Sequence, residues 1–221
     1  MNIIRNYMVR IPLLHKVGSN ISKKIRFLRY KYKNSFDVNY IGSISYDIVG
    51  RGNKISIHAT EINHLHVRIR GNNNTLTINN NVIIGPRCSI WIKGDGISIV
   101  IGDNTTFTQD CHLCAQENDT SIVIGKDCMF SNHIVVRTSD SHPYYDINSG
   151  LRLNHAKSVV IKDHVWIAPN CKIMKGSIIG EGCIIGSDSS TNKEYENTCL
   201  IAGRPAKIIR TNVRWTREKL F

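Results

Sequence analysis

Isoleucine recurs every six residues along the C-terminal part of the chain. It opens five successive hexads, IKDHVW, IAPNCK, IMKGSI, IGEGCI and IGSDSS, which begin at Ile161. The fifth residue of each hexad is small or medium-sized, from Val165 to Ser189. A period of six fits neither an α-helix nor the alternation of one long strand. It predicts short, flat strands separated by corners, with three hexads to a triangular turn and successive turns stacked in parallel around one continuous core.

The same phase runs through the middle of the chain. Further hexad-opening residues are Ile78, Ile84, Ile90, Ile101, Phe107, Leu113, Ile124, Phe130 and Val136. The small fifth position is a cysteine in five hexads, at Cys88, Cys111, Cys128, Cys171 and Cys183. Seven cysteines in total, with a single CxxC pair, match neither a disulfide framework nor a zinc finger. We therefore expect reduced cysteines that pack inside the coil.

Breaks in the hexad phase divide the chain into parts. The β-helix is expected to span residues 41–204, with less regular first turns. Residues 137–160 interrupt it, and a loop of this size in a regular coil usually carries function. We expect residues 1–40 to form a basic, largely helical N-terminal arm, and residues 205–221 to form a short C-terminal helix.

Positive charge is concentrated at the N-terminus. The 221 residues carry a formal net charge of +12, yet residues 1–33 hold nine Lys/Arg and no acid, which leaves +3 for the rest. Such an arm could be a solvated helical face or could contact a membrane peripherally; it lacks the motifs of a nucleic-acid-binding domain. No apolar run reaches the roughly 18–20 residues that span a bilayer. Residues 1–16 do not have the form of a secretory signal, so a cytoplasmic location is expected.

Three segments carry the motifs of a known family: IGKDCMFSNHIVVRTSDSHP (124–143), IKDHVWIAPNCKIMKGSIIGEGCIIG (161–186) and LIAGRPAKIIR (200–210). They resemble the hexapeptide-repeat, acetyl-CoA-dependent sugar acetyltransferases, in the branch that includes galactoside, maltose, O-antigen and capsule enzymes. The resemblance implies an all-β fold, a left-handed parallel β-helix that assembles as a homotrimer with active sites between subunits. It also implies acetyl-CoA as cosubstrate, a sugar or nucleotide sugar as acceptor, and no metal.

The Ser-His-Pro motif in the long interruption places His142 where the family has its general base. An ordinary imidazole titrates near ~6.5 and can therefore accept a hydroxyl or amine proton at neutral pH. Asp140, two residues earlier, could orient the imidazole or meet an ammonium group.

The resemblance also places the coenzyme. Trp166 is expected to shape the pantetheine slot, and the backbone amide of Ala168 to stabilise the oxyanion. Further residues near the C-terminal coils are expected to line the groove or meet the coenzyme phosphates: Ser187, Asn192, Lys193, Arg204, Lys207 and Arg210.

The acceptor site departs from the family pattern, in which an Asn on an earlier coil holds the sugar. The corresponding segment here is TQDCHLCAQEND (108–119), where Asp110 or His112 could substitute. Residues of the interruption could cover the sugar ring through stacking and polar contacts: Tyr144, Tyr145, Asp146 and Arg152.

Several functions remain open at this point. We favour acetylation of the amino group of a nucleotide-linked amino sugar, because a small cytoplasmic enzyme meets soluble substrates and the chain's length and character are similar to those of enzymes that N-acetylate GDP-perosamine. O-Acetylation of a sugar or polysaccharide is the alternative. A structural prism that docks polyanions through its basic arm is a non-enzymatic alternative. A carbonic anhydrase of the γ type would need His112, His133 and His142 to converge on zinc between subunits.

Overall fold

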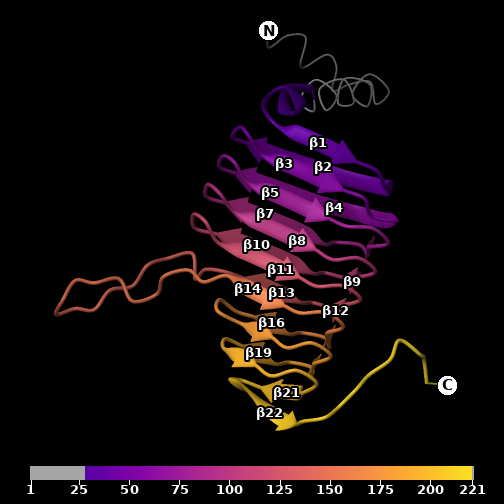
Figure 1. Cartoon of the computed structure of the whole chain (residues 1–221). Coiled ribbons are helices and arrows are strands. Elements are labelled where there is room, and N and C mark those ends of the chain that lie inside the picture. The colour runs from indigo at the N-terminus through magenta and orange to yellow at the C-terminus, as the bar shows by residue number, and fades with distance from the viewer. Residues whose placement is uncertain (1–27, 221) are drawn as a thin grey trace, which may run out of the picture.

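A computed structural model describes residues 28–220, whose strands wind into a parallel β-helix (Figure 1). Residues 1–27 of the arm predicted for residues 1–40 lie outside the described residues. Residues 28–33 are helical, as predicted, but β1 begins at Ser35, inside the segment assigned to the arm. No helix within residues 28–220 has the length and apolar character needed to cross a bilayer.

Three flat faces enclose the core, and each turn of the chain passes along face 1, face 2 and face 3 in that order. Face 1 is an eight-stranded sheet of β1 (Ser35–Val38), β3 (Lys54–Ile57), β5 (Thr75–Ile78), β8 (Ser98–Ile101), β11 (Ser121–Ile124), β14 (Val159–Ile161), β17 (Ile178–Ile179) and β20 (Glu194–Tyr195). Face 2 contains β6 (Ile83–Ile84), β9 (Thr106–Gln109), β12 (Met129–Asn132), β15 (Trp166–Ile167), β18 (Ile184–Ile185), β21 (Leu200–Gly203) and β22 (Ala206–Arg210).

Face 3 contains β2 (Ile41–Val49), β4 (Glu61–Arg70), β7 (Ser89–Lys93), β10 (His112–Gln116), β13 (Val135–Arg137), β16 (Lys172–Ile173) and β19 (Ser190–Thr191). Faces 2 and 3 form one fourteen-stranded sheet, because β4 pairs first with β6 and then with β7. We name the edges of the prism by the faces that they join: corner 1–2, corner 2–3 and corner 3–1.

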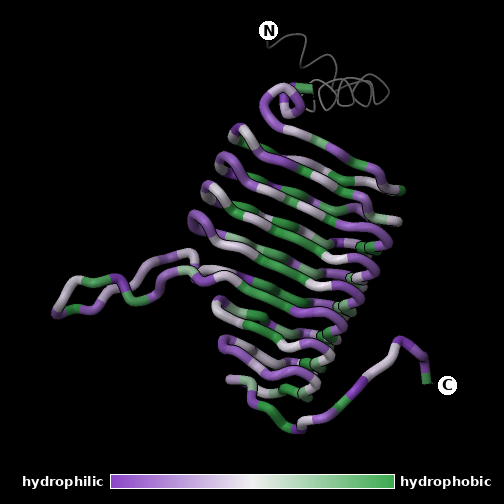
Figure 2. Tube along the Cα trace, in the orientation of Figure 1, coloured by the Kyte–Doolittle hydropathy of each residue, from purple (hydrophilic) through white to green (hydrophobic). Residues whose placement is uncertain are grey.

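The hexad positions point inward, as predicted. All five isoleucines from Ile161 to Ile185 are fully buried, and so are the fifth-position residues from Val165 to Ser189. Each isoleucine stacks on its equivalent one turn away; Ile161, for example, lies opposite Ile179. Apolar residues therefore follow the strands while hydrophilic residues gather at the corners (Figure 2).

The corners require backbone conformations that few residues adopt. Asn104, Asp127 and Asn170 turn the chain with φ values of 61°, 53° and 63°. Asn and Asp tolerate this left-handed region better than other residues with a side chain. Their clustering after the hexad isoleucines therefore reflects the geometry of the turn.

The cysteines are reduced packing residues, as predicted. All seven are buried and free within the structure. Cys128 Sγ donates to Lys162 O at 3.2 Å and Cys171 Sγ donates to Gly186 O at 3.1 Å, so these thiols link neighbouring turns. Burial raises the pKa of Cys128 to about 12, which keeps it protonated and unreactive.

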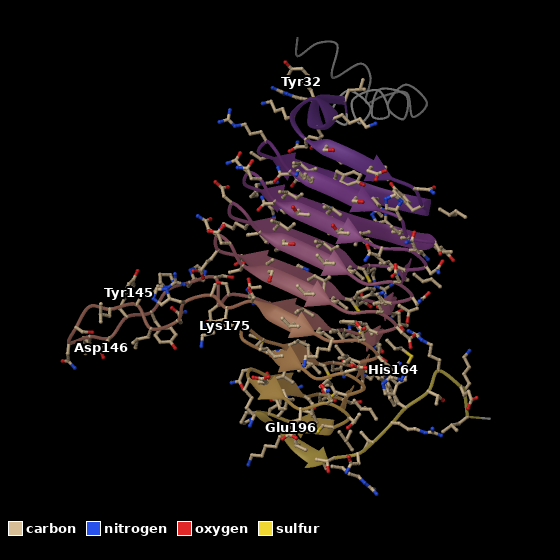
Figure 3. All side chains as sticks on the ribbon, viewed as in Figure 1. Tyr32, Tyr145, Asp146, His164, Lys175 and Glu196 are labelled. Atoms are coloured by element: carbon tan, nitrogen blue, oxygen red, sulfur yellow. The ribbon has the colours of Figure 1, made fainter. Side chains whose placement is uncertain are left out.

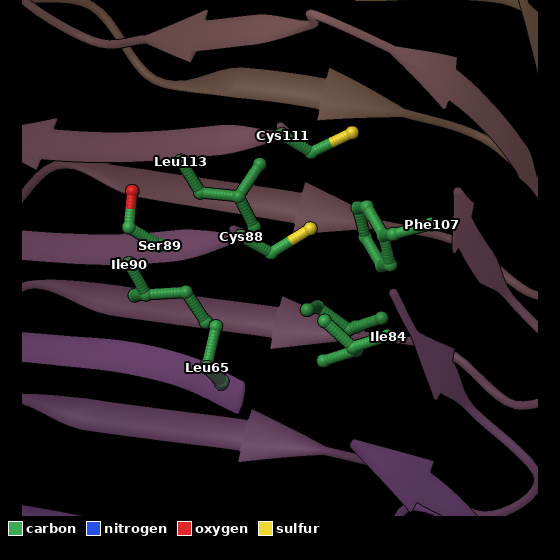
Figure 4. Close-up of a pocket in the computed structure, with 9 residues that line it drawn as sticks. Leu65, Ile84, Cys88, Ser89, Ile90, Phe107, Cys111 and Leu113 are labelled. Atoms are coloured by element: carbon green, nitrogen blue, oxygen red, sulfur yellow. The ribbon is translucent and has the colours of Figure 1, made fainter. Parts of the chain in front are cut away.

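The void found inside the prism of residues 28–220 is too small for a substrate. A void of about 10 Å³ lies between Cys88, Cys111 and Phe107 (Figure 4). A cavity of this size accommodates at most one water molecule. Any binding site of the described chain must therefore lie on the outside of the prism.

The predicted C-terminal helix is wrong. Residues Ala206–Arg210 form β22, which pairs antiparallel with β21. The last turn of a β-helix leaves the hydrogen-bonding edge of its final strand open, and the hairpin pairs that edge. Residues 211–220 then continue without helix or strand.

Candidate active site

The interruption leaves the prism at corner 3–1, between β13 and β14, and forms a long projection (Figure 1). We call residues 138–158 the excursion; the predicted bounds were 137–160. Its two sides pair at an isolated antiparallel bridge between Tyr145 and Arg152. Ile147 and Leu151 are 95% and 67% exposed, so the excursion carries apolar surface that none of residues 28–220 covers.

Asn154 fixes the base of the excursion around His142. Asn154 is 2% exposed, and its Nδ2 donates to Asp140 Oδ2 and to the carbonyl oxygen of His142, each at 2.9 Å. Its Oδ1 accepts the backbone N–H of Tyr144 at 2.9 Å. The backbone on both sides of the exposed His142 is therefore held by one buried amide.

Asp140 connects the excursion to the prism. Its Oδ2 lies 2.5 Å from Lys175 Nζ, at the base of the excursion in Figure 3, and this lysine lowers the pKa of the carboxyl. Lys175 also donates to Asn154 O at 3.2 Å. Hydrogen bonds through Asn154 therefore link Asp140 to the backbone carbonyl of His142, and not to the imidazole that Asp140 was predicted to orient.

Arg152 is a second anchor of the excursion. It binds Glu117 with two hydrogen bonds, Nη1 to Oε2 at 2.7 Å and Nη2 to Oε1 at 2.8 Å. Ser139 Oγ also donates to Glu117 Oε1 at 2.6 Å. These contacts, with Arg152 the main cause, lower the pKa of Glu117 to about 2. The guanidinium of Arg152, which was predicted to cover the sugar ring, is therefore bound to a carboxylate on the neighbouring turn.

The other predicted ring-covering residues lie farther out on the excursion. Tyr144 and Tyr145 are 57% and 59% exposed. Asp146 Oδ1 accepts the backbone N–H groups of Asn148 and Ser149 at 3.0 and 2.7 Å and so shapes the turn at the far end. Figure 3 shows Tyr145 and Asp146 well away from Lys175.

A hollow opens beside His142 at corner 3–1. It has a volume of about 350 Å³ and is lined by Lys93, Gly94, Gln116, Glu117, Asn118, Ser139, Ser141, Pro143 and Arg152. Ser141 and Pro143 flank His142 in the chain. A sugar held there would contact the two chain neighbours of the predicted base, whereas His142 itself does not line the hollow.

His112 lies on the face that leads to this hollow, and Asp110 does not. His112 is on β10, where its Nδ1 lies 2.7 Å from Ser89 Oγ and burial lowers its pKa. Asp110 sits at corner 2–3, where its oxygens accept Arg87 Nε at 2.6 Å and Nη2 at 2.7 Å. The two acceptor candidates therefore occupy different edges of the prism.

Among the predicted coenzyme residues, Trp166 has a buried polar atom without a partner in residues 28–220. It lies on face 2 between Met129 and Ile184 in register, and its indole Nε1 is buried with no hydrogen-bond partner among the described residues. The N–H of Ala168, predicted to stabilise the oxyanion, instead donates to Ile185 O at 2.9 Å because Ala168 continues the ladder to the next turn. The unsatisfied donor on this face is thus the indole.

The remaining coenzyme candidates lie in three places: corner 2–3, β22 at the end of face 2, and corner 3–1. Ser187 is exposed at corner 2–3, where Arg204 Nη2 donates to Asp188 Oδ1 at 3.1 Å. Lys207 and Arg210 are exposed on β22 at the end of face 2. Asn192 and Lys193 precede β20 at corner 3–1, and Lys193 Nζ lies 5.6 Å from the centre of the Tyr195 ring.

One chain does not bring the base and the coenzyme face together. His142 leaves the prism at corner 3–1, whereas Trp166 points outward from face 2. In a triangular prism, face 2 lies opposite corner 3–1. A site that uses both residues therefore requires a second copy of the chain.

The C-terminal tail adds residues to face 2 that the sequence did not predict. Trp215 stacks on His164 with ring centroids 4.1 Å apart and lies 6.2 Å from Trp166. Arg217 Nε donates to Asp127 Oδ1 at 2.6 Å. The only sequence signal for these contacts was the presence of a tryptophan and an arginine in an otherwise polar tail. Their partners, His164 and Asp127, lie 51 and 90 residues away in the chain, so the sequence did not show the contacts.

No group of three or more His, Cys, Asp or Glu side chains within residues 28–220 is arranged to hold a metal ion. The three histidines that a zinc site would need are spread over the prism: His112 on face 3, His133 at corner 2–3 and His142 at corner 3–1.

Known proteins resemble the chain in sequence and in fold. A family model described as bacterial transferase hexapeptide (six repeats) matches residues 158–193. The chain is 38% identical over 90 residues to a polysialic acid O-acetyltransferase of Escherichia coli O1:K1 / APEC, and 35% identical over 92 residues to one of Neisseria meningitidis. Each match covers 41% of this chain, and they cover 29% and 43% of the relatives, so the matched stretch spans less than half of either curated relative.

Two solved structures align over most of the chain. The polysialic acid O-acetyltransferase OatWY superposes with a TM-score of 0.77 at 32% identity, over 85% of this chain and 89% of that one. The polySia-specific acetyltransferase NeuO superposes with a TM-score of 0.65 at 32% identity, over 85% of this chain and 84% of that one. The parallel β-helix expected from the hexads, with the left hand that the resemblance implied, is confirmed.

Proposed function

Because the chain belongs to the hexapeptide-repeat acetyltransferase family, we propose that it transfers an acetyl group from acetyl-CoA to a hydroxyl of a surface-polysaccharide sugar. The observation that carries this proposal is the hollow lined by Ser141 and Pro143, the residues on either side of His142, at the base of the excursion of the β-helix. O-Acetylation replaces the expected amino-sugar acceptor, because the relatives that align over most of the chain are named for polysialic acid. No finding supports GDP-perosamine as acceptor.

The proposed chemistry uses two side chains. His142 accepts the proton of the sugar hydroxyl while the hydroxyl oxygen attacks the thioester carbonyl. Trp166 of the partner subunit donates its indole N–H to the oxyanion that forms, a role favoured by the lack of any partner for this buried group among the described residues. The carbon–sulfur bond then breaks, and His142 returns the proton to the departing thiolate.

A homotrimer supplies the second copy. The outward positions of face 1 are uncharged from β5 to β17: Thr75, Thr77, Ser98, Val100, Ser121, Val123, Val160 and Ile178. A flat, uncharged sheet face can be buried against a neighbour at little cost in desolvation. Neighbouring copies that meet through face 1 would also cover the apolar excursion. We place the enzyme in the cytoplasm because that compartment supplies acetyl-CoA.

The test measures thiol release from acetyl-CoA and locates the added acetyl group by mass spectrometry. We expect His142→Ala to lower kcat by about 10²–10⁴-fold while acetyl-CoA binding survives. Trp166→Phe is expected to lower kcat by about 10²–10³-fold. His155→Ala, an exposed histidine of the same excursion, is the matched control and should leave kcat unchanged. Near-normal turnover of His142→Ala would refute the mechanism.

A further inference from the structure

The C-terminal tail, residues 211–220, turns back along corner 1–2 after β22 (Figure 1). It has no helix or strand, so individual contacts hold it in place. Val213 N donates to Thr198 O at 2.9 Å, on the last turn of the coil. Among residues 211–220 only Trp215 is buried, at 6% exposed. The tail therefore places one large aromatic ring against the outside of the prism.

Arg217 anchors the tail beyond this ring. Its Nε donates to Asp127 Oδ1 at 2.6 Å, and its Nη groups make three more hydrogen bonds to the prism, at 3.0 and 3.1 Å. Val213 is bound on the other side of the ring, three turns farther along the coil. The tail is thus fixed both before and after Trp215.

The Trp215 ring is itself held in one orientation. It stacks on the ring of His164, with the centroids 4.1 Å apart and the planes inclined by 6°. Its Nε1 donates to the carbonyl oxygen of His164 at 2.9 Å. His164 Nδ1 in turn lies 2.7 Å from Asp127 Oδ2, the carboxylate that also binds Arg217. A stacked ring whose N–H is also bonded has little freedom to rotate.

Trp215 closes the open side of Trp166. The two ring centroids lie 6.2 Å apart and the planes are inclined by 49°, within the range of an aromatic pair. Along the prism axis, the strand register places Met129 on one side of Trp166 and Ile184 on the other. Towards corner 1–2, the neighbouring ring is that of Trp215. Three side chains therefore surround the Trp166 indole.

The Trp166 indole depends on such ring contacts for its orientation. Its Nε1 is buried without a hydrogen-bond partner in residues 28–220, so no bond within that part of the chain fixes the direction of the N–H. A donor stabilises an oxyanion only if it points at the position where the negative charge develops. Packing around the ring must therefore set the geometry that the reaction needs.

We propose that Trp215 is a positioning residue, which holds the Trp166 indole with its N–H directed at the reacting thioester. This inference rests on the proposed function, in which Trp166 is the oxyanion donor, and adds the C-terminal tail to the machinery of that site. Trp215 acts through Trp166 and not on the substrates. A tail that only covered the end of the coil would affect stability, but its effect on turnover would not depend on Trp166.

The first test measures kcat and KM by thiol release from acetyl-CoA. We expect Trp215→Ala to lower kcat about 10- to 100-fold, with each KM changed less than about threefold, because the donor is misdirected while the binding groups stay. Trp215→Phe keeps a ring against Trp166 and should retain kcat within about threefold. Lys219→Ala, an exposed residue of the same tail, is the matched control and should behave like wild type.

A double-mutant cycle shows whether Trp215 acts through Trp166. In a Trp166→Phe background, Trp215→Ala should lower kcat by less than about twofold further, because the donor is already absent. Losses that multiply would overturn the inference. Arg217→Gln releases the tail while keeping both indoles, and it should lower kcat about 3- to 10-fold in the presence of Trp166 only. Circular dichroism and light scattering check that each variant is folded and assembled like wild type.

Fluorescence tests the contact without turnover. The chain has three tryptophans, so Trp166 is the only emitter in Trp91→Phe/Trp215→Phe and in Trp91→Phe/Trp215→Ala. We expect emission at longer wavelength and stronger quenching by acrylamide in the alanine variant. Identical emission and quenching in the two variants would overturn the inference.

These outcomes separate the inference from the proposed function. Loss of kcat in Trp166→Phe but not in Trp215→Ala would overturn the positioning role alone. Full kcat in Trp166→Phe would refute the oxyanion donor and the positioning role together. Absence of turnover in the wild type would refute the proposed function, and the emission of Trp166 would then still decide whether Trp215 holds it.

Discussion

Removal of one buried amide at the base of the excursion should disable the enzyme without unfolding it. In Asn154→Ala, three hydrogen bonds of 2.9 Å are lost, to Asp140 Oδ2, to His142 O and from Tyr144 N. At a net ~0.5–1.5 kcal/mol each, these bonds contribute about 1.5–4.5 kcal/mol to the ordering of the backbone at His142. Because about 1.4 kcal/mol corresponds to a factor of ten, we expect kcat to fall between roughly 10- and 1,000-fold.

The same variant should leave the prism intact. Asn154 lies on the excursion, outside the stacked isoleucine core, so Tm should change by no more than a few degrees. The assay is thiol release at saturating acetyl-CoA and acceptor, with tryptic cleavage at Arg152 as a second measure of excursion order. Asn148→Ala, in the turn after Asp146, is the matched control because its side chain is exposed. A kcat within twofold of wild type for Asn154→Ala would refute the claim that this amide positions His142.

Three further predictions concern pH, assembly and the cysteines. The Glu117 pKa of about 2 lies below the value for the unfolded chain, so its contribution to excursion order is complete above about pH 4.5 and is lost as the pH falls towards 2. Pepsin should therefore cut the wild-type excursion progressively faster over that interval, whereas Glu117→Gln should be cut rapidly throughout. Val123→Arg places a charge on face 1 and should give monomers by light scattering, with activity lost; an active trimer would contradict the assigned interface. A disulfide reagent should label fewer than one of the seven buried cysteines per native chain, and all seven in denaturant.

The repeat was readable from sequence because the constraint is local. Each hexad needs one large inward residue, one small one and a corner, and these demands recur at a fixed spacing. The buried isoleucines, the inward cysteines and the Asn and Asp corners all follow from it. The C-terminal hairpin does not follow the repeat. There the open edge of β21 favours a strand over a helix, and that edge exists only in the folded protein.

The candidate site, too, was predictable from the sequence only in part. Motifs predicted His142 as the base and placed Trp166 beside the pantetheine slot, while the oxyanion role was assigned to the amide of Ala168. The folded coil places His142 and Trp166 on opposite sides of the prism, so the proposed site, which uses both, needs a second copy of the chain. Sequence also could not show that Arg152 is bound to Glu117, because the two meet over 35 residues through the stacking of one turn on another.

The hexads alone predict a coil of stacked triangular turns, because a period of six buries its isoleucines only when short strands alternate with corners. The contacts between turns, which exist only in the folded protein, determine which polar groups hold the excursion and which have no partner among residues 28–220. The physical reason is that turns 15 to 40 residues apart in the chain become neighbours about 4.8 Å apart in space, and pairing across them leaves no trace in the spacing of residues.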